Sequence, residues 1–274
     1  MAEPIGWFEA VLLGLIQGLT EFLPISSSAH VLIVSQIFGW EDPGAAFTAV
    51  IQIGTEAAVI VYFRRDLARI LRAWSHSLRT RVHTTESKLG WYIIIGTVPI
   101  VILGVTFTRQ IETAARNLWL VASVLIVFGV VLGLADRYGA KMRSLSSMSS
   151  RDGVILGFGQ ALALIPGVSR SGATITTGLA LGYTREAAAR YSFLLAIPAV
   201  LGAGFYEASK IGTDSSVAWG PTLAATAISF VVGYAVIAWL LRYISTHSFL
   251  PFVIYRIALG AGVLTLLSLG ILSS

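Results

Sequence analysis

The sequence predicts an all-α integral membrane protein with six transmembrane helices and two re-entrant helical hairpins in an inverted-topology repeat. Three observations support this fold class. The 274-residue chain is 55% hydrophobic and only 12% charged, whereas soluble domains carry about 25% charged residues. The apolar residues form runs long enough to cross a bilayer, for which about 20 residues are needed. Two further apolar stretches, similar to each other, are interrupted by glycine, proline, serine and charged residues.

The composition also excludes several classes of protein. The net charge of +5 comes from basic residues in loops beside apolar runs, which is typical of membrane topology and not of a nucleic-acid-binding surface. The chain has no cysteine, so disulfides, thiolate catalysis and cysteine-based metal sites are absent. The start MAEPIGWFEA lacks the basic region and cleavage site of a signal peptide, so we expect the apolar segment from Ile5 to belong to the mature fold.

The chain contains two similar sets of predicted elements, each an interrupted apolar stretch followed by three uninterrupted apolar runs. The interrupted stretches cover about 5–40 and 153–184, and each is interpreted as two short helices joined by a polar turn. Non-helical backbone at membrane depth must be buried in protein or line a wet cavity, so both stretches are expected to be re-entrant hairpins. The six uninterrupted runs, all expected to span the bilayer, are roughly 46–63, 91–108, 117–135, 188–206, 221–241 and 251–272.

Lysine and arginine predict the orientation of the single membrane domain, residues 1–274. The loop at 64–88 is rich in arginine, and basic residues recur at 137–151 and at Arg242. Basic loops favour the cytoplasmic side, so both termini are expected to face outward. The segment SLSSMSS at 144–150 is expected to be a polar linker in mid-chain.

The two interrupted stretches align without gaps at a shift of 143 residues, where LGLIQGLTEFLPISSS matches LGFGQALALIPGVSRS. Chance similarity between segments rich in leucine, glycine and serine is the alternative. Each hairpin precedes three spans, an odd number, so the second copy enters from the opposite face. We therefore expect inverted repeats at about 5–135 and 153–272, with a binding site where the broken segments meet near the midplane. The alignment pairs Gln17 with Gln160, Ser26 with Ser169, and Ser28 with Ser171.

The turn PGVSRSGAT at 166–174 is typical of a phosphate cradle. A guanidinium such as that of Arg170 matches phosphate oxygens bidentately, and a helix start adds free backbone amides. Alternatively, Arg170 forms a structural ion pair with Glu21. The two interpretations are compatible if the ion pair forms without ligand and the phosphate cradle forms when ligand binds. The hydroxyl side chains expected to bind the ligand from this turn are those of Ser169, Ser171 and Thr174.

The first turn places a carboxylate, hydroxyls and an imidazole within ten residues, in QGLTEFLPISSSAH. These groups can activate a nucleophile, hold a metal or protonate a leaving oxygen. We expect Glu21, Ser27 and His30 to be catalytic together with Arg170. For His30 the alternative is an ordinary buried histidine bonded to a backbone carbonyl. The expected binding residues of this turn are Gln17, Ser26 and Ser28.

QGLTE at 17–21, SSSAH at 26–30 and PGVSRSGAT together resemble the bacitracin-resistance type of undecaprenyl-diphosphate phosphatase. The likeness includes FLLAIPAV at 193–200 and SFLPFVIYR at 248–256, and so covers nearly the whole chain. It implies a phosphatase of the bacterial inner membrane that releases phosphate from a C55 isoprenoid diphosphate and returns the lipid carrier to cell-wall synthesis. It also implies an active site that opens to the outer face and a divalent cation, Mg²⁺ or Ca²⁺, that promotes activity. A homodimer is possible on this resemblance.

One position departs from the pattern of that family. Many relatives carry glutamate where this chain has Gln17, so the first motif keeps a single carboxylate, that of Glu21. Glu56, an acid inside the run at 46–63, could supply a second carboxylate to a metal, or could instead form a hydrogen bond to the first hairpin. Both alternatives stay open at this point.

Two routes for the chemistry are compatible with these residues. Either Ser27 attacks the terminal phosphorus with His30 as its base, or His30 activates a water directly. A transporter of an anionic or polyprenyl-phosphate substrate is the alternative function, because inverted repeats with broken helices are common in transporters. A purely structural subunit would leave the buried Glu21, His30 and Arg170 unexplained.

Overall fold

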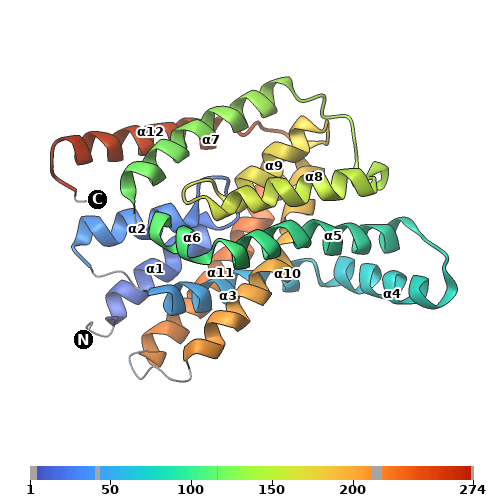
Figure 1. Cartoon of the computed structure of the whole chain (residues 1–274), viewed down its shortest axis with the longest axis horizontal. Coiled ribbons are helices and arrows are strands. Elements are labelled where there is room, and N and C mark those ends of the chain that lie inside the picture. Colours follow the sequence, from blue (N-terminus) through green and yellow to red (C-terminus); the bar gives the residue numbers. More distant parts are fainter. Residues whose placement is uncertain (1–4, 41–43, 116, 212–217, 273–274) are drawn as a thin grey trace.

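The computed structural model describes residues 5–40, 44–115, 117–211 and 218–272, and their regular structure is helical, without a β-strand (Figure 1). The helices are α1 (Trp7–Thr20), α2 (Ser27–Phe38), α3 (Gly44–Tyr62), α4 (Arg64–Thr80), α5 (Thr85–Thr106), α6 (Thr108–Ala115), α7 (Leu118–Tyr138), α8 (Ser150–Ala161), α9 (Arg170–Ala180), α10 (Arg185–Ile211), α11 (Trp219–Ile244) and α12 (Leu250–Ser268).

The membrane character of the chain is clear from its long helices. Five helices in the described part of the chain, α5, α7, α10, α11 and α12, are long and apolar enough to cross a bilayer. A sixth is added if α3 and α4, which meet at a bend of 76°, are taken as one broken span. The all-helical membrane fold is therefore confirmed, with five or six candidate spans close to the expected runs.

Both interrupted stretches fold as two short helices joined by a non-helical turn, as expected. The first turn lies between α1 and α2, and the second between α8 and α9. The residue before the second helix is a serine with a left-handed backbone in both cases, with φ of 72° at Ser26 and at Ser169. Non-glycine residues seldom adopt this region without a functional or packing reason.

The first helices of these pairs are held against long helices by close glycine contacts. A Cβ on Gly14 of α1 would lie 2.5 Å from the Ala225 carbonyl oxygen of α11. A Cβ on Gly157 of α8 would lie 2.5 Å from the Gly96 carbonyl oxygen of α5. Neither distance can accommodate a side chain, so each helix approaches its neighbour backbone to backbone.

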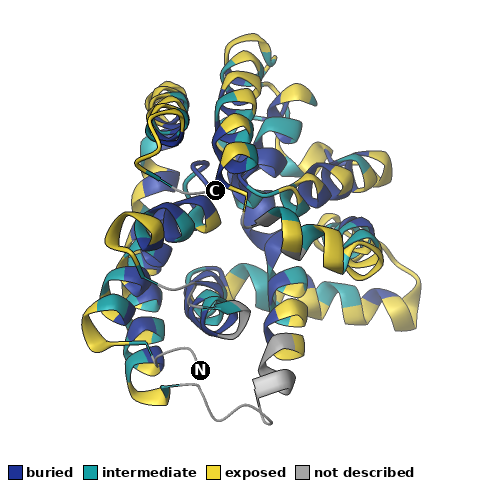
Figure 2. Ribbon diagram, turned by 60° about the vertical axis from the view of Figure 1, so that its left-hand side comes forward, coloured by how far each residue is buried: buried dark blue, intermediate teal, exposed yellow. Residues whose placement is uncertain are grey.

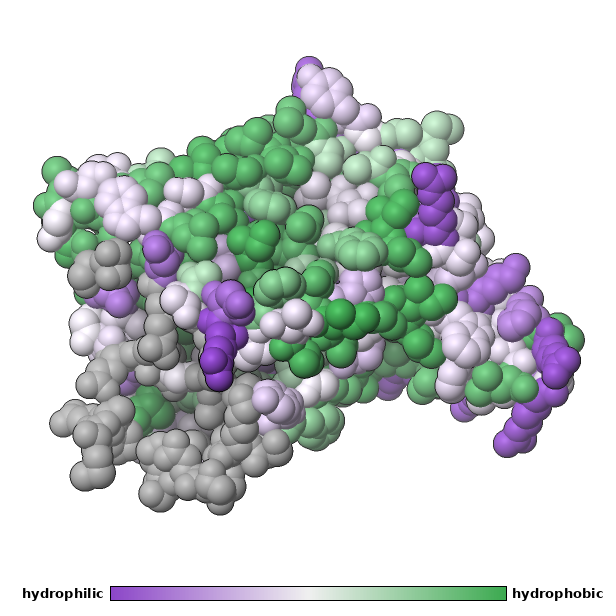
Figure 3. Space-filling model, viewed as in Figure 1, coloured by the Kyte–Doolittle hydropathy of each residue, from purple (hydrophilic) through white to green (hydrophobic). Residues whose placement is uncertain are grey.

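The segment at 64–88 was expected to be a loop, and this expectation was wrong, because most of it forms α4. A further short helix, α6, follows α5. In α4, Ile70 and Trp74 pack around Gly90 of α5 while the arginines stay exposed. The apolar residues of α4 recur at helical spacing, which predicts an amphipathic helix. This pattern was overlooked because the many arginines of the segment were interpreted only as a topology signal. In Figure 3 this end of the molecule is the most hydrophilic part of the face shown.

The outward faces of the long helices are apolar. Val105, Val231 and Trp239 are exposed, and apolar residues cover the middle of the face in Figure 3. Figure 2 shows buried residues concentrated where the helices face one another and exposed residues on the outside. This distribution reverses the usual polar surface of a soluble protein and suits contact with lipid tails.

A buried carboxylate anchors the start of α8, outside the candidate spans. Asp152 accepts hydrogen bonds from Arg143, from the backbone and hydroxyl of Ser149, and from the Tyr183 hydroxyl. Burial alone would raise the pKa of Asp152, but these hydrogen bonds outweigh burial and hold that pKa below its usual range. The supposed linker at 144–150 thus ends in a helix cap, in which Ser149 and Asp152 form a capping box.

We predict that Asp152→Asn destabilises the purified protein by about 1–3 kcal/mol at pH 7, because it breaks charge-assisted hydrogen bonds at a nearly buried site. The lowered pKa means that the contribution of Asp152 is complete above about pH 4, the unfolded value, and is lost as the pH falls through the folded pKa. Thermal unfolding in detergent should show a difference at pH 7 that shrinks below pH 4.

Glu186→Gln is the matched control, since Glu186 is half-exposed and lies 3.6 Å from Arg190 in an i,i+4 pair. Such exposed pairs contribute little, so its unfolding temperature should stay close to that of the wild type. Equal unfolding temperatures of Asp152→Asn and wild type at pH 7 would contradict the assignment.

Candidate active site

One buried arginine of α12 ties the two turns together. The Arg256 guanidinium is fully buried and donates to the carbonyl oxygen of Pro24 in the first turn at 3.0 Å. It also donates to Gly167 and Val168 in the second turn, each at 3.0 Å, and to Leu125 of α7 at 3.2 Å. Because turn carbonyls lack helical partners, this single cation satisfies several of them at once. The two turns are thus fixed next to each other.

Glu21 contacts three of the polar side chains gathered at these turns. Its Oε1 accepts from Arg170 Nη2 at 2.5 Å, an ion pair between the two halves of the chain. Its Oε2 accepts from the Gln17 amide at 2.7 Å and from the Ser27 hydroxyl at 2.6 Å. The ion pair with Glu21 that was the alternative for Arg170 is therefore formed in this structure. It offsets the cost of placing a carboxylate among apolar helices.

Glu56 of α3 completes this charged group. Its Oε2 lies 3.8 Å from Arg170 Nη1, and its side chain is fully buried. Neither of its carboxylate oxygens has a hydrogen-bond partner, so the hydrogen bond to the first hairpin, one of the two alternatives, is not made. Arg170 thus stands between two carboxylates, with Nη1 itself unbonded.

His30 is not bonded to Ser27. Its Nδ1 lies 2.7 Å from the Ser26 carbonyl oxygen and its Nε2 lies 2.8 Å from the Tyr255 hydroxyl of α12. The Ser27 hydroxyl points instead to Glu21. The bond to a backbone carbonyl that was the alternative for His30 is present, together with a tyrosine contact that sequence reasoning missed. In this arrangement the carboxylate, and not the imidazole, is placed to take a proton from Ser27.

The remaining hydroxyls differ in accessibility. Ser28 is exposed and Ser27 is half-buried, whereas Ser26 is buried, with its hydroxyl 3.3 Å from that of Ser28. Ser28 and Ser27 are therefore the hydroxyls of the first turn that a ligand could reach without rearrangement.

The second turn uses its hydroxyls to support the backbone. Ser169 accepts from the Gly172 amide at 3.2 Å and so caps α9. The Ser171 hydroxyl donates to the Leu23 carbonyl of the first turn at 3.0 Å, and that of Thr174, fully buried, donates to the Arg170 carbonyl at 3.0 Å. The three residues are brought beside Arg170 as expected, with their hydroxyls already engaged.

The oxygen donors near Glu21 suit a hard cation. Gln17 Oε1 and both oxygens of Glu56 are buried without hydrogen-bond partners. Mg²⁺ and Ca²⁺ bind carboxylate and amide oxygens of this kind. No group of three or more histidine, cysteine, aspartate or glutamate side chains that could hold a metal is present among the described residues. A cation here would therefore rest on Glu21, Glu56 and the Gln17 amide oxygen.

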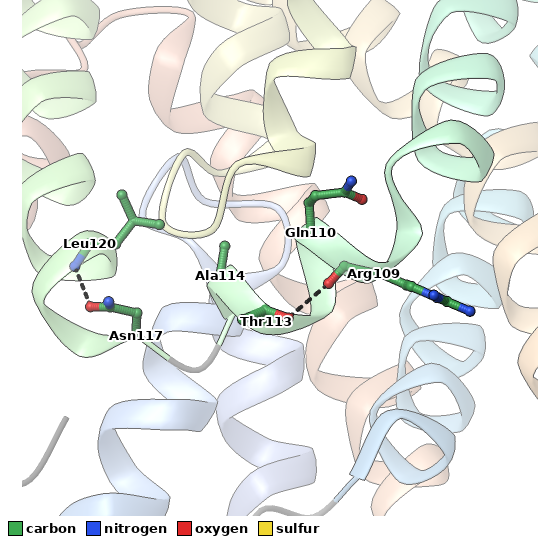
Figure 4. Close-up of a pocket in the computed structure, with 6 residues that line it drawn as sticks. All are labelled: Arg109, Gln110, Thr113, Ala114, Asn117 and Leu120. Atoms are coloured by element: carbon green, nitrogen blue, oxygen red, sulfur yellow. Dashed lines mark hydrogen bonds between the residues drawn. The ribbon is translucent and has the colours of Figure 1, made fainter.

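A surface hollow lies at α6 and the start of α7 (Figure 4). Asn117 caps α7 there through the Leu120 amide, and Thr113 bonds to its own helix at Arg109. None of the expected site residues lines this hollow, and its residues bring no buried charge together. Its lining residues are Arg109, Gln110, Thr113, Ala114, Asn117 and Leu120.

Sequence reasoning missed the two α12 residues that reach the site. Tyr255 and Arg256 are adjacent in SFLPFVIYR, and each contacts a residue more than eighty positions away. The available signal was an arginine in the middle of an apolar run, where a charge is costly and usually functional.

Comparisons with known proteins give a consistent result over the whole chain. The family model described as "Bacitracin resistance protein BacA" matches residues 10–262. A protein of Nocardioides sp. named undecaprenyl-diphosphatase is 57% identical over 274 residues, covering 98% of this chain and 100% of its own length. Proteins named undecaprenyl-diphosphatase 2 from Agrobacterium fabrum and Streptomyces avermitilis are 57% and 55% identical, covering 98% of this chain and 99% and 97% of their own lengths.

We predict that Arg256→Met lowers the free energy of unfolding by about 3–5 kcal/mol, because the buried turn carbonyls lose their common donor. Arg242→Met, an exposed arginine at the end of α11, should change it by less than about 0.5 kcal/mol. Thermal unfolding of the detergent-purified variants measures both. An Arg256→Met protein as stable as the Arg242→Met protein would show that the turns do not depend on this cation.

Proposed function

Starting from the finding that the chain belongs to the bacitracin resistance protein BacA family, we propose that the site around Glu21, Ser27 and Arg170 carries out its reaction. The chain is an integral membrane undecaprenyl-diphosphatase. It converts undecaprenyl diphosphate to undecaprenyl phosphate and inorganic phosphate, and so recycles the lipid carrier of cell-wall synthesis. The observation that carries the site assignment is the hydrogen bond from Ser27 to Glu21, beside an arginine held between two carboxylates.

Arg170 is proposed to clamp the diphosphate. Its guanidinium is paired with Glu21 at 2.5 Å and lies 3.8 Å from Glu56. The oxygens of a diphosphate can accept two parallel hydrogen bonds from the guanidinium. One of these can come from Nη1, which has no hydrogen-bond partner here. The backbone amides at the starts of α2 and α9 face anions favourably. The ion pair thus keeps the arginine in place until the substrate replaces part of it.

Ser27 is proposed to be the nucleophile and Glu21 its base. As the Ser27 Oγ–phosphorus bond forms, the serine proton passes to Glu21, and the bond from the terminal phosphorus to the bridging oxygen breaks. Undecaprenyl phosphate leaves with the electron pair of that bond. Water then attacks the phosphoserine, the Oγ–phosphorus bond breaks, and phosphate is released as Ser27 regains a proton. Direct attack by a water on the terminal phosphorus, with His30 as base, remains the alternative route.

Positioning and charge stabilisation account for most of the catalysis in phosphoryl transfer. A divalent cation held by Glu21, Glu56 and the Gln17 amide oxygen would neutralise phosphate charge and polarise the phosphoryl oxygens. Ser26, Ser28, Ser169, Ser171 and Thr174 are proposed to bind or support the diphosphate from the two turns.

The finer topology is also a proposal. Six spans and two re-entrant hairpins, α1–α2 and α8–α9, form inverted repeats at about 5–135 and 153–272. Its support is that positions 143 residues apart, Gly14 and Gly157 or Ser26 and Ser169, have the same backbone role. We propose that the chain lies in the inner membrane with the site opening outward, and the basic segments support the orientation of the chain. The isoprenoid tail would lie in the bilayer beside the apolar outer faces.

The test of the function is phosphate release from undecaprenyl or farnesyl diphosphate by detergent-purified protein. We predict that Glu21→Ala, Ser27→Ala and Arg170→Ala each lower turnover by about 100-fold or more, while Arg242→Ala retains wild-type turnover. Release by the wild type and its loss in these variants would support the site. A folded wild-type protein without release would contradict the function and return the transporter to consideration, since transport has no meaning in detergent.

The Ser27→Ala variant also separates the two chemical routes. A phosphoserine trapped at Ser27 by acid quenching during turnover supports covalent catalysis. Near-normal turnover of Ser27→Ala would eliminate the serine route and leave direct attack by water.

We predict that Gln17→Glu lowers the half-activating concentration of Mg²⁺ or Ca²⁺ by about tenfold, because a second carboxylate beside Glu21 adds charge to the cation's ligands. Gln110→Glu, an exposed position on α6, is the control and should leave that concentration unchanged. The measurement is phosphate release after EDTA treatment and titration with each cation. An unchanged half-activating concentration in Gln17→Glu would place the cation elsewhere.

A further inference from the structure

Both ring nitrogens of His30 are engaged by groups from different parts of the fold. Nδ1 lies 2.7 Å from the Ser26 carbonyl oxygen, and a carbonyl can only accept, so Nδ1 carries a hydrogen. In the neutral imidazole the lone pair is then on Nε2, which lies 2.8 Å from the Tyr255 hydroxyl. The tyrosine is therefore the donor of this hydrogen bond, and the pair of contacts selects one tautomer of His30.

The two rings are also packed together. The centroids of His30 and Tyr255 are 5.5 Å apart and the ring planes differ by 8°, an offset stack. His30 is 8% exposed, whereas Tyr255 is 44% exposed. The phenol thus forms the boundary between the imidazole and the exterior of the helical fold, where an incoming lipid would meet it.

The position of Tyr255 is fixed by its neighbour in sequence. Arg256 bonds to carbonyls of both turns and of α7, so α12 cannot slide or rotate relative to the site. A tyrosine placed by such an anchor reaches the same nitrogen of His30 in every molecule. Nothing in the chemistry assigned to Glu21, Ser27 and Arg170 accounts for this contact.

We propose that Tyr255 is a positioning residue of the diphosphatase, acting through His30. Its hydroxyl holds the imidazole in one orientation, with the Nε2 lone pair directed to α12 and away from Ser27. Two separate hydrogen-bonded pairs result, Ser27 with Glu21 and His30 with Tyr255. The separation leaves the serine proton to the carboxylate and holds the imidazole in one orientation beside the site. The inference rests on the proposed function insofar as His30 takes part in turnover.

The test is Tyr255→Phe, which keeps the stacked ring and removes only the hydroxyl. We expect kcat for farnesyl diphosphate to fall about five- to tenfold, the loss of one hydrogen bond in the transition state, with KM changing less than about twofold. Tyr234→Phe is the matched control, because Tyr234 of α11 is 37% exposed and packs by its ring on Tyr62. It should retain wild-type kcat.

A second measurement does not depend on activity. In protein labelled with ¹⁵N-histidine, the His30 signals are assigned by their loss in His30→Gln. Tyr255→Phe should shift the Nε2 resonance toward that of a nitrogen with a free lone pair and leave the protonated Nδ1 in place. Tyr234→Phe should leave both resonances unchanged.

The outcomes separate this inference from the function itself. An Nε2 resonance that shifts in Tyr255→Phe as expected, together with wild-type protein that releases no phosphate, would overturn the diphosphatase function and keep the contact. Wild-type release together with an unchanged kcat in Tyr255→Phe would overturn the positioning role. An increase confined to KM would also overturn it, since the hydroxyl would then be a substrate contact. An unchanged Nε2 resonance would overturn the contact.

Discussion

The whole site depends on how backbone carbonyls are satisfied at membrane depth. Two turns that interrupt apolar helices leave oxygens without helical partners, and lipid offers no water to bond them. One guanidinium, Arg256, meets this requirement for both turns and for α7 at once. Because its acceptors come from both halves of the chain, satisfying them also determines the distance between the halves. The position of every reactive group at the turns follows from that distance.

Charge balance imposes the second constraint. Glu21 and Arg170 come from opposite halves of the chain, and each would be costly alone among apolar helices. Their ion pair offsets this cost. It also keeps an anion-binding cation and a proton acceptor beside the Ser27 hydroxyl. The same interaction therefore serves both the stability of the fold and the proposed catalysis, and Glu56 adds a second negative charge 3.8 Å from the arginine.

Comparison of expectation and structure shows where sequence patterns were sufficient. Long apolar runs predicted the long helices, and prolines and glycines predicted the breaks in the two shorter stretches, because both signals are local. The amphipathic helix α4 was missed although its period is present, since its arginines were interpreted only as a topology signal. For Ser27 the sequence left open whether His30 is its base. In the structure the Ser27 hydroxyl donates to Glu21, and His30 contacts Tyr255 of α12, which sequence proximity does not indicate.

The sequence by itself determined the membrane class, the two interrupted stretches and the chemical types gathered in them, because hydropathy and turn-forming residues act within a few positions. It also indicated that Glu21 and Arg170 could pair, since two isolated charges in apolar surroundings need partners. Only the tertiary structure decided which hydroxyl faces which carboxylate, and that Tyr255 and Arg256 complete the site. The contacts of Tyr255 and Arg256 join residues more than eighty positions apart, and their geometry depends on how α12 packs against both turns.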